Sequence, residues 1–202
     1  GFMIRIENVE NKDEKTKVTL EIMNALPEWF SPPEDNERKS EMHREYPFIV
    51  AYDDEKAVGF VAIKMHNHYT AEIYDLGVLR EHQRRGIGHR LIEACVAYCK
   101  EQGYQFLTVK TLDESAEYEP YNGTRAFYKK EGFYPLEVFT CVWDEENDTH
   151  TYHMIPSKMT KKMKDFQHSH LFLMPYEKID TKNMEYSDKE SAKFNNIYEI
   201  VQ

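Results

Sequence analysis

The sequence predicts an α/β fold in which helices pack against a central sheet. Short apolar runs of strand character alternate with segments of helical periodicity along most of the chain. Two of the apolar runs, residues 48–52 and 57–65, flank the turn Asp53-Asp54-Glu55-Lys56 and predict a β-hairpin. A glycine-rich turn over residues 83–88 then joins a strand-like run to a strongly helical one.

The first elements follow from periodicity and from proline. Ile4, Ile6 and Val9 predict a strand over residues 4–10. A helix over residues 16–26 should end before Pro27, because the residue preceding a proline disfavours the helical conformation. The loop 29–33 follows, and residues 34–46 are so polar that we expect a solvated helix before the hairpin.

The second half continues the alternation. The expected order is a strand over residues 71–79, the glycine turn, a helix over 89–102, a strand over 106–109, a helix over 122–131 that ends at Gly132, and strands over 136–143 and 151–155 joined by a turn over 144–148. Cys95 and Cys99 lie on the apolar face of their helix and are expected to be buried thiols. We expect no structural metal.

Residues 158–202 are predicted to extend a domain that spans residues 3–157. Residues 171–174 predict a strand, and Phe194, Ile197, Tyr198 and Val201 fall at helical spacing. These apolar side chains need a surface to cover. Either the domain itself or the partner subunit of a homodimer would provide it.

Composition excludes two classes of protein. The net charge of −10 disfavours a nucleic-acid partner, which would require basic surface. No run approaches the ~18 apolar residues of a membrane span, and residues 4–10 have a strand pattern rather than that of a signal peptide. A soluble, cytoplasmic protein is therefore expected.

The glycine turn has the physical properties of a phosphate site. Gly86 and Gly88 lack Cβ atoms, so the backbone there can approach a ligand closely. The first N–H groups of the following helix have no intrahelical partner and lie at its positive end, where they favour an anion. Arg84 and Arg85 add positive charge beside it. A helix-capping turn would share this pattern, so neighbouring motifs must decide.

Three motifs in order resemble the GNAT superfamily of N-acetyltransferases. Residues 83–88, Gln-Arg-Arg-Gly-Ile-Gly, resemble its acetyl-CoA-binding turn; residues 71–78, Ala-Glu-Ile-Tyr-Asp-Leu-Gly-Val, resemble the preceding strand; and residues 125–133 resemble its second motif. The resemblance covers roughly residues 3–157. It implies a mixed, mostly antiparallel central sheet with flanking helices, acetyl-CoA as co-substrate, and transfer of the acetyl group to an amine of a small molecule or a peptide.

The resemblance also implies which residues bind acetyl-CoA. Its pantetheine arm should follow the backbone of Leu76, Gly77 and Val78, in a splay between that strand and the next one. The pyrophosphate should lie over the turn and helix start, formed by Gln83, Arg84, Arg85, Gly86, Ile87, Gly88, His89 and Arg90. Asn122 is a weaker candidate, because the family's asparagine falls one residue earlier, where this chain has Tyr121.

Two residues match the family's catalytic positions. The acceptor amine has to lose a proton before it attacks, since an alkylamine with a pKa near ~10.4 is mostly protonated at neutral pH. By resemblance Glu72 is the general base, with Tyr74 and Asp75 as alternatives. Tyr128 is the expected acid for the departing thiolate, because a phenol with a pKa near ~10 is protonated at pH 7. The structural alternatives are a Glu72 that faces solvent or pairs with a lysine and a Tyr128 that only packs in the core.

The acceptor site is expected among aromatic and acidic residues. Trp29, Phe30, Tyr118 and Tyr121 are the candidate binding residues, and Asp113, Glu114, Glu117 and Glu119 form an acidic loop beside them. Such a rim would attract a cationic amine, although a solvated acidic loop has the same composition. A catalytically silent acetyl-CoA-binding domain is the alternative to an enzyme.

Overall fold

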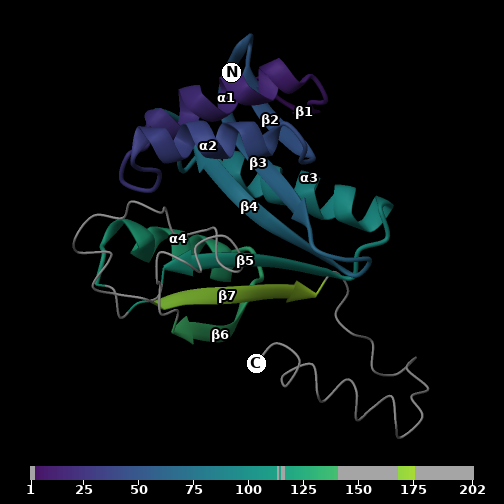
Figure 1. Cartoon of the computed structure of the whole chain (residues 1–202), viewed down its shortest axis with the longest axis vertical. Helices are drawn as coiled ribbons and strands as arrows, with labels where there is room; N and C mark the ends of the chain where they lie inside the picture. The colour runs from purple at the N-terminus through teal and green to yellow at the C-terminus, as the bar shows by residue number, and fades with distance from the viewer. Residues whose placement is uncertain (1–2, 113, 115–116, 141–167, 176–202) are drawn as a thin grey trace, which may run out of the picture.

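One sheet organises the computed structural model, which describes residues 3–112, 114, 117–140 and 168–175. Within these residues the sheet has seven strands in the order β1-β2-β3-β4-β5-β7-β6 (Figure 1). The strands are β1 Ile4–Asn8, β2 Phe48–Asp53, β3 Lys56–Met65, β4 Thr70–Val78, β5 Phe106–Leu112, β6 Tyr134–Thr140 and β7 His168–Pro175.

The sheet is mixed and mostly antiparallel, as expected. Only the β4–β5 pair is parallel among the strands described. That pairing joins Thr70–Ile73 to Phe106–Val109 and goes no further, so the two strands separate at Ile73 and Val109. A bulge in β4 lies at the same level, because the β3–β4 register shifts between Ala62 and Ile63. The sheet therefore opens at its centre.

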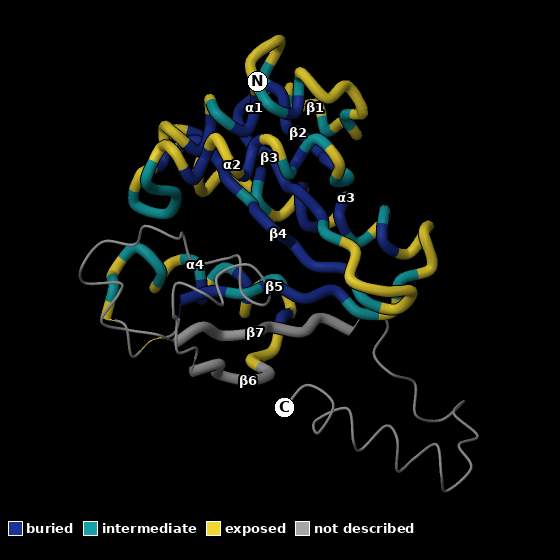
Figure 2. The backbone as a smooth tube through the Cα atoms, viewed as in Figure 1, coloured by how far each residue is buried: buried dark blue, intermediate teal, exposed yellow. Residues whose placement is uncertain are grey.

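Helices cover both faces of the first four strands. The helices are α1 Lys12–Asn24, α2 Pro33–His43, α3 Ile87–Glu101 and α4 Pro120–Lys130, with a short 3-10 turn, η1, over Arg80–His82. A Cβ on Gly59 would lie 3.2–3.3 Å from Leu91 and Ile87 of α3, whereas the ring of the next residue, Phe60, faces His43 of α2. Of these strands, β2, β3 and β4 are consequently buried along most of their length, as Figure 2 shows.

The first two helices differ most from the sequence-based expectation, whereas α3 and α4 each begin only two residues earlier than expected. α1 begins at Lys12 rather than residue 16, because the Asn11 side chain caps the helix by accepting a hydrogen bond from the Glu14 N–H at 2.9 Å. The prediction of a solvated α2 is wrong. Its inner face is polar but buried, and it consists of Asp35, Asn36, Lys39, Ser40 and His43. Hydrophobicity gives no signal for such a face.

The C-terminal part of the described chain joins the sheet. β7 includes the strand expected over residues 171–174, and it lies between β5 and β6, so the sheet continues beyond residue 157. The strand expected over 151–155 and the helical spacing after residue 193 lie outside the described residues. Cys95 and Cys99 are buried thiols, as predicted. Among the described helices, none has the length and apolar character needed to cross a membrane.

Candidate active site

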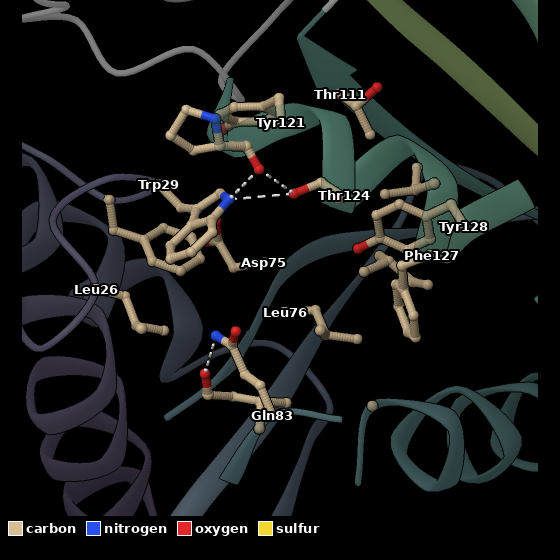
Figure 3. A pocket seen from close by; sticks show the side chains of 18 of the residues that line it. Leu26, Trp29, Asp75, Leu76, Gln83, Thr111, Tyr121, Thr124, Phe127 and Tyr128 are labelled. Atoms are coloured by element: carbon tan, nitrogen blue, oxygen red, sulfur yellow. Dashed lines mark hydrogen bonds between the residues drawn. The ribbon is translucent and has the colours of Figure 1, made fainter. Parts of the chain in front are cut away.

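A cavity of about 780 Å³ occupies the opening between β4 and β5. Both strands contribute where their pairing has ended, with residues 73–78 on one side and 109–112 on the other. α4 and the loop between α1 and α2 complete the walls (Figure 3). The β4 edge facing the cavity has no ladder partner in the described chain beyond Ile73, so its backbone groups are open to an extended ligand.

The glycine turn contributes to the lining of this cavity. Gly86 has a φ of +79° and caps α3, and a Cβ built there meets no atom within 4 Å. The helix start thus faces open space. Gly88 is needed for packing instead, since its Cβ would lie 3.1 Å from the Phe127 ring of α4. His89 donates hydrogen bonds to Glu131, 2.7 Å away, and to Glu93, 2.6 Å away; the Glu131 contact is the larger cause that raises the pKa of His89.

Tyr128 also lines the cavity. Its side chain is 5% exposed and packs against the rings of Phe127 and Phe133. Figure 3 shows its hydroxyl directed toward the cavity, on the side of Leu76. Burial raises the pKa of Tyr128, so the phenol is protonated throughout the physiological range.

Hydrogen bonds join the loop between α1 and α2 to α4 and to the segment before it. The Trp29 Nε1–H donates to the Pro120 carbonyl and to Thr124 Oγ1, both at 3.1 Å (Figure 3). The Tyr118 hydroxyl donates to the Glu28 carbonyl at 2.8 Å. These bonds place Trp29, Phe30 and Tyr121 together as an aromatic wall of the cavity.

Glu72 lies in a buried cluster of charges. It is 1% exposed, its Oε1 is 2.6 Å from His66 Nε2, and its carboxylate is 3.2–3.3 Å from Lys110 Nζ. Burial acts to raise the pKa of Glu72, but the His66 hydrogen bond and the Lys110 charge outweigh it and hold the pKa below its ordinary value. Lys110 lines the cavity, and Glu72 does not.

Asp75, like Glu72, contacts one lysine and one histidine. Its Oδ1 accepts from Lys39 Nζ at 2.8 Å, and its Oδ2 is 2.7 Å from His43 Nε2. The other ring nitrogen of His43 lies 2.8 Å from Thr19 Oγ1. Burial acts to raise the pKa of Asp75, but Lys39 and then His43 outweigh it and lower the pKa. Here both Asp75 and Lys39 line the cavity.

The predicted site residues divide into two groups. Those that line the cavity are Trp29, Phe30, Leu76, Gly77, Val78, Gln83, Arg84, Gly86, Gly88, His89, Tyr121 and Tyr128. Those outside the lining are Glu72, Arg85, Ile87, Arg90, Tyr118 and Asn122. The Arg90 guanidinium donates to the Ile4 carbonyl at 2.9 Å, and Asn122 accepts from Arg125. Their side chains are therefore engaged elsewhere.

Several residues that line the cavity were not predicted from the sequence. They are Glu28, Lys39, Arg80, Lys110, Thr111 and Thr124. None belongs to a motif, and most come from loops or from a strand end. The spacing of Asp35, Asn36, Lys39, Ser40 and His43 on one face of α2 was the available signal, but polar residues at helical spacing ordinarily indicate a solvated face.

Comparison with known proteins identifies this arrangement. The family model described as "Acetyltransferase (GNAT) family" matches residues 16–133, more than half of the chain. The chain belongs to the GNAT acetyltransferase family. Human N-acetyltransferase 8 is 31% identical to this GNAT protein over 116 residues, which are 54% of this chain and 48% of that protein. The chain thus matches about half the length of that relative.

Solved structures show the same fold at low sequence identity. The ribosomal-protein-S18-alanine N-acetyltransferase of Escherichia coli is 14% identical, with a TM-score of 0.63 over 91% of this chain and all of that one. A GNAT acetyltransferase of Elizabethkingia anophelis with acetyl-CoA bound is 17% identical, with a TM-score of 0.60 over 85% of this chain and 97% of that one. The predicted GNAT fold is confirmed.

Proposed function

We propose that this protein transfers an acetyl group from acetyl-CoA to a primary amine. The observation that carries the proposal is one cavity whose lining includes the glycine turn, the open β4 edge, Tyr128, Trp29 and Phe30. Membership of the acetyltransferase family supports acetyl-CoA as co-substrate. The name of the related N-acetyltransferase 8 supports a nitrogen acceptor.

The expected binding mode follows the cavity. The pyrophosphate would lie against the first N–H groups of α3, where the helix end favours an anion and Gly86 leaves space. The pantetheine amides would pair with the β4 backbone at residues 76–78, as an added strand pairs with a sheet edge. The thioester would then lie beside Tyr128, with the N–H of Leu76 as the proposed donor to the oxyanion.

The proposed reaction is a direct attack. The amine nitrogen forms a bond to the acetyl carbon, the carbon–sulfur bond breaks, and Tyr128 gives its proton to the departing thiolate. The amine proton passes to a carboxylate of β4. The motif position assigns this role to Glu72. Because Glu72 lies outside the cavity lining and its partner Lys110 is part of it, Glu72 would act through a water. Asp75 lines the cavity directly and is the alternative. Both carboxylates are ionised at neutral pH because their pKa values are lowered.

A thiol-release assay tests the function. Acetyl-CoA is offered with peptides, polyamines, aminoglycosides and amino acids, and the acetylated product is identified by mass spectrometry. We expect thiol release that depends on an amine and matches the product in amount. Tight binding of acetyl-CoA by calorimetry without acetylation of any amine would instead support the silent acetyl-CoA-binding domain. A cytoplasmic location and a homodimer remain parts of the proposal.

A further inference from the structure

The buried polar face of α2 is not explained by packing alone. A polar group taken out of water costs free energy unless it gains a partner, and an apolar helix face would fill the same space without that cost. Lys39 is 3% exposed and His43 is fully buried. Both reach the same residue, Asp75 of β4, at the acceptor end of the cavity.

Lys39 presents an ammonium group to the cavity. Its Nζ lies 2.8 Å from Asp75 Oδ1, 5.9 Å from the Phe30 ring centroid and 5.7 Å from that of Tyr74. An ammonium has three N–H donors. Asp75 accepts one of them, and the two rings supply only weak cation–π contacts, so Lys39 retains capacity for a further acceptor. Lys39, Phe30, Tyr74 and Asp75 all line the cavity.

Asp75 does not depend on Lys39 for its orientation. His43 contacts its second oxygen at 2.7 Å, and Thr19 in turn holds the His43 ring at 2.8 Å. The Lys39 ammonium and the Asp75 carboxylate are therefore neighbours that belong to different elements, α2 and β4. The Lys110–Glu72 pair is different, because Lys110 contacts both carboxylate oxygens of a residue outside the cavity lining.

We propose that Lys39 binds a carboxylate of the acceptor, so that the acceptor is an amino acid or another amine with a carboxylate near its amine. The ammonium of such a molecule faces Asp75 and its carboxylate faces Lys39, which matches each buried charge with its opposite. This inference rests on the proposed amine acetyltransferase function. It excludes polyamines and aminoglycosides as the preferred acceptors.

The first experiment compares acceptors that differ only in the carboxylate. Phenylalanine, leucine and lysine are each assayed beside their carboxamides and their decarboxylated amines. Lys39 and the acceptor carboxylate would form a charge-assisted hydrogen bond. In the set that is acetylated fastest, the amino acid should therefore have a specificity constant roughly tenfold to a hundredfold above those of its two analogues. Lys39→Met should remove that preference, so that the amino acid no longer has a higher specificity constant than its decarboxylated amine.

Lys15→Met is the matched control. Lys15 is also a buried lysine on this side of the sheet, but it donates to the Arg44 and Tyr46 carbonyls at 3.3 and 2.6 Å and lies outside the cavity lining. The Lys15→Met variant should keep the preference for the amino acid over its two analogues. Lys39→Gln serves if Lys39→Met does not fold, since an amide can still donate to Asp75 without a charge.

The second experiment requires no turnover. Calorimetry measures binding of the N-acetyl derivatives of the same three amino acids in the presence of CoA. Lys39→Gln should weaken the tightest of them about tenfold or more. The inference is overturned if none of the derivatives binds, if Lys39→Gln leaves their affinities unaltered, or if analogues without the carboxylate are acetylated as well as the amino acids. Failure of every amine in the thiol-release assay would refute the proposed function separately.

Discussion

The Lys110 ammonium lies 3.2 Å from Glu72 Oε2 and is the member of this ion pair that lines the cavity. His66, with its side chain 34% exposed, holds Oε1 of the same carboxylate from the other direction at 2.6 Å. Glu72 is therefore ionised and fixed, but it lies outside the cavity lining, whereas its partner Lys110 is part of that lining. This geometry makes its proposed role as base the first one to test.

Glu72→Gln should lower turnover by roughly 10²–10⁴ if Glu72 is the base, because the amide cannot accept the amine proton. Acetyl-CoA affinity should not change, since Glu72 lies outside the cavity lining. Asp75→Asn is measured in parallel by steady-state kinetics across the pH range. Near-normal rates for Glu72→Gln together with a large loss for Asp75→Asn would move the role to Asp75.

The two buried carboxylates should also make the fold sensitive to acid. Their pKa values are lowered in the folded state from ordinary values of about 4.3 for Glu and 3.9 for Asp. Their contribution to stability is therefore fully present above those ordinary values and is lost as the pH falls through the lowered ones. Tm measured by calorimetry from about pH 6 to 3 should fall, most steeply below about pH 4.

Glu72→Gln combined with Asp75→Asn should flatten this part of the Tm curve, because neither amide titrates. Glu114→Gln is the control, since Glu114 is exposed and lies 3.6 Å from Lys129 at the surface. A double variant with the same acid slope as the unmodified protein would contradict the assignment of acid sensitivity to these two groups.

Tyr128→Phe should reduce turnover and leave acetyl-CoA affinity intact. The substitution keeps the ring packed against Phe127 and Phe133 and removes only the hydroxyl that faces the cavity. Loss of an acid typically costs about 10²–10⁴ in rate. Tyr98→Phe on α3, outside the cavity lining, should have no effect. Unchanged kinetics in Tyr128→Phe would leave this tyrosine a packing role.

Gly86→Asp should abolish most acetyl-CoA binding. It places a negative charge at the start of α3, where the pyrophosphate is proposed to lie. Gly103→Asp is a close control, because Gly103 also has a positive φ, +84°, also has nothing within 4 Å of a Cβ, and lies beyond the other end of α3. Both variants should carry similar backbone strain. Equal affinities by calorimetry would refute the phosphate site.

The acidic loop should matter only for acceptors with a net positive charge. Glu119 lines the cavity, Glu114 and Glu117 are exposed beside it, and Asp113 lies outside the described residues. Replacement of Glu114, Glu117 and Glu119 together by Gln should lower the specificity constant for lysine and weaken its salt dependence. Phenylalanine, which is neutral overall, is the control. Identical behaviour of lysine before and after replacement would make the loop an ordinary solvated surface.

Local sequence determined the strand, the glycine turn and the helix whose backbone groups face the cavity. Gly86 and Gly88, the strand before them and the helix after them are short-range patterns, and the structure has β4, the turn and α3 close to where these patterns predict them. The chemistry of the glycine turn is a property of residue type and spacing, which a sequence displays directly. That Trp29, Phe30, Tyr121 and Tyr128 meet in one cavity was expected only from the resemblance to the GNAT family, because no local pattern links residues so far apart.

Tertiary structure decided the environments of the charged residues. Lys39 and Asp75 are 36 positions apart, and Glu72 and Lys110 are 38 apart, so no local pattern links either pair. The polar face of α2 indicates solvent when it is considered alone, but it is buried against partners from other elements, such as Asp75 for Lys39 and His43. The place of β7 between β5 and β6 is also a long-range choice, since it depends on which strand edge remains open. Burial, pKa and strand order depend on what lies across the sheet, and only the folded chain contains that information.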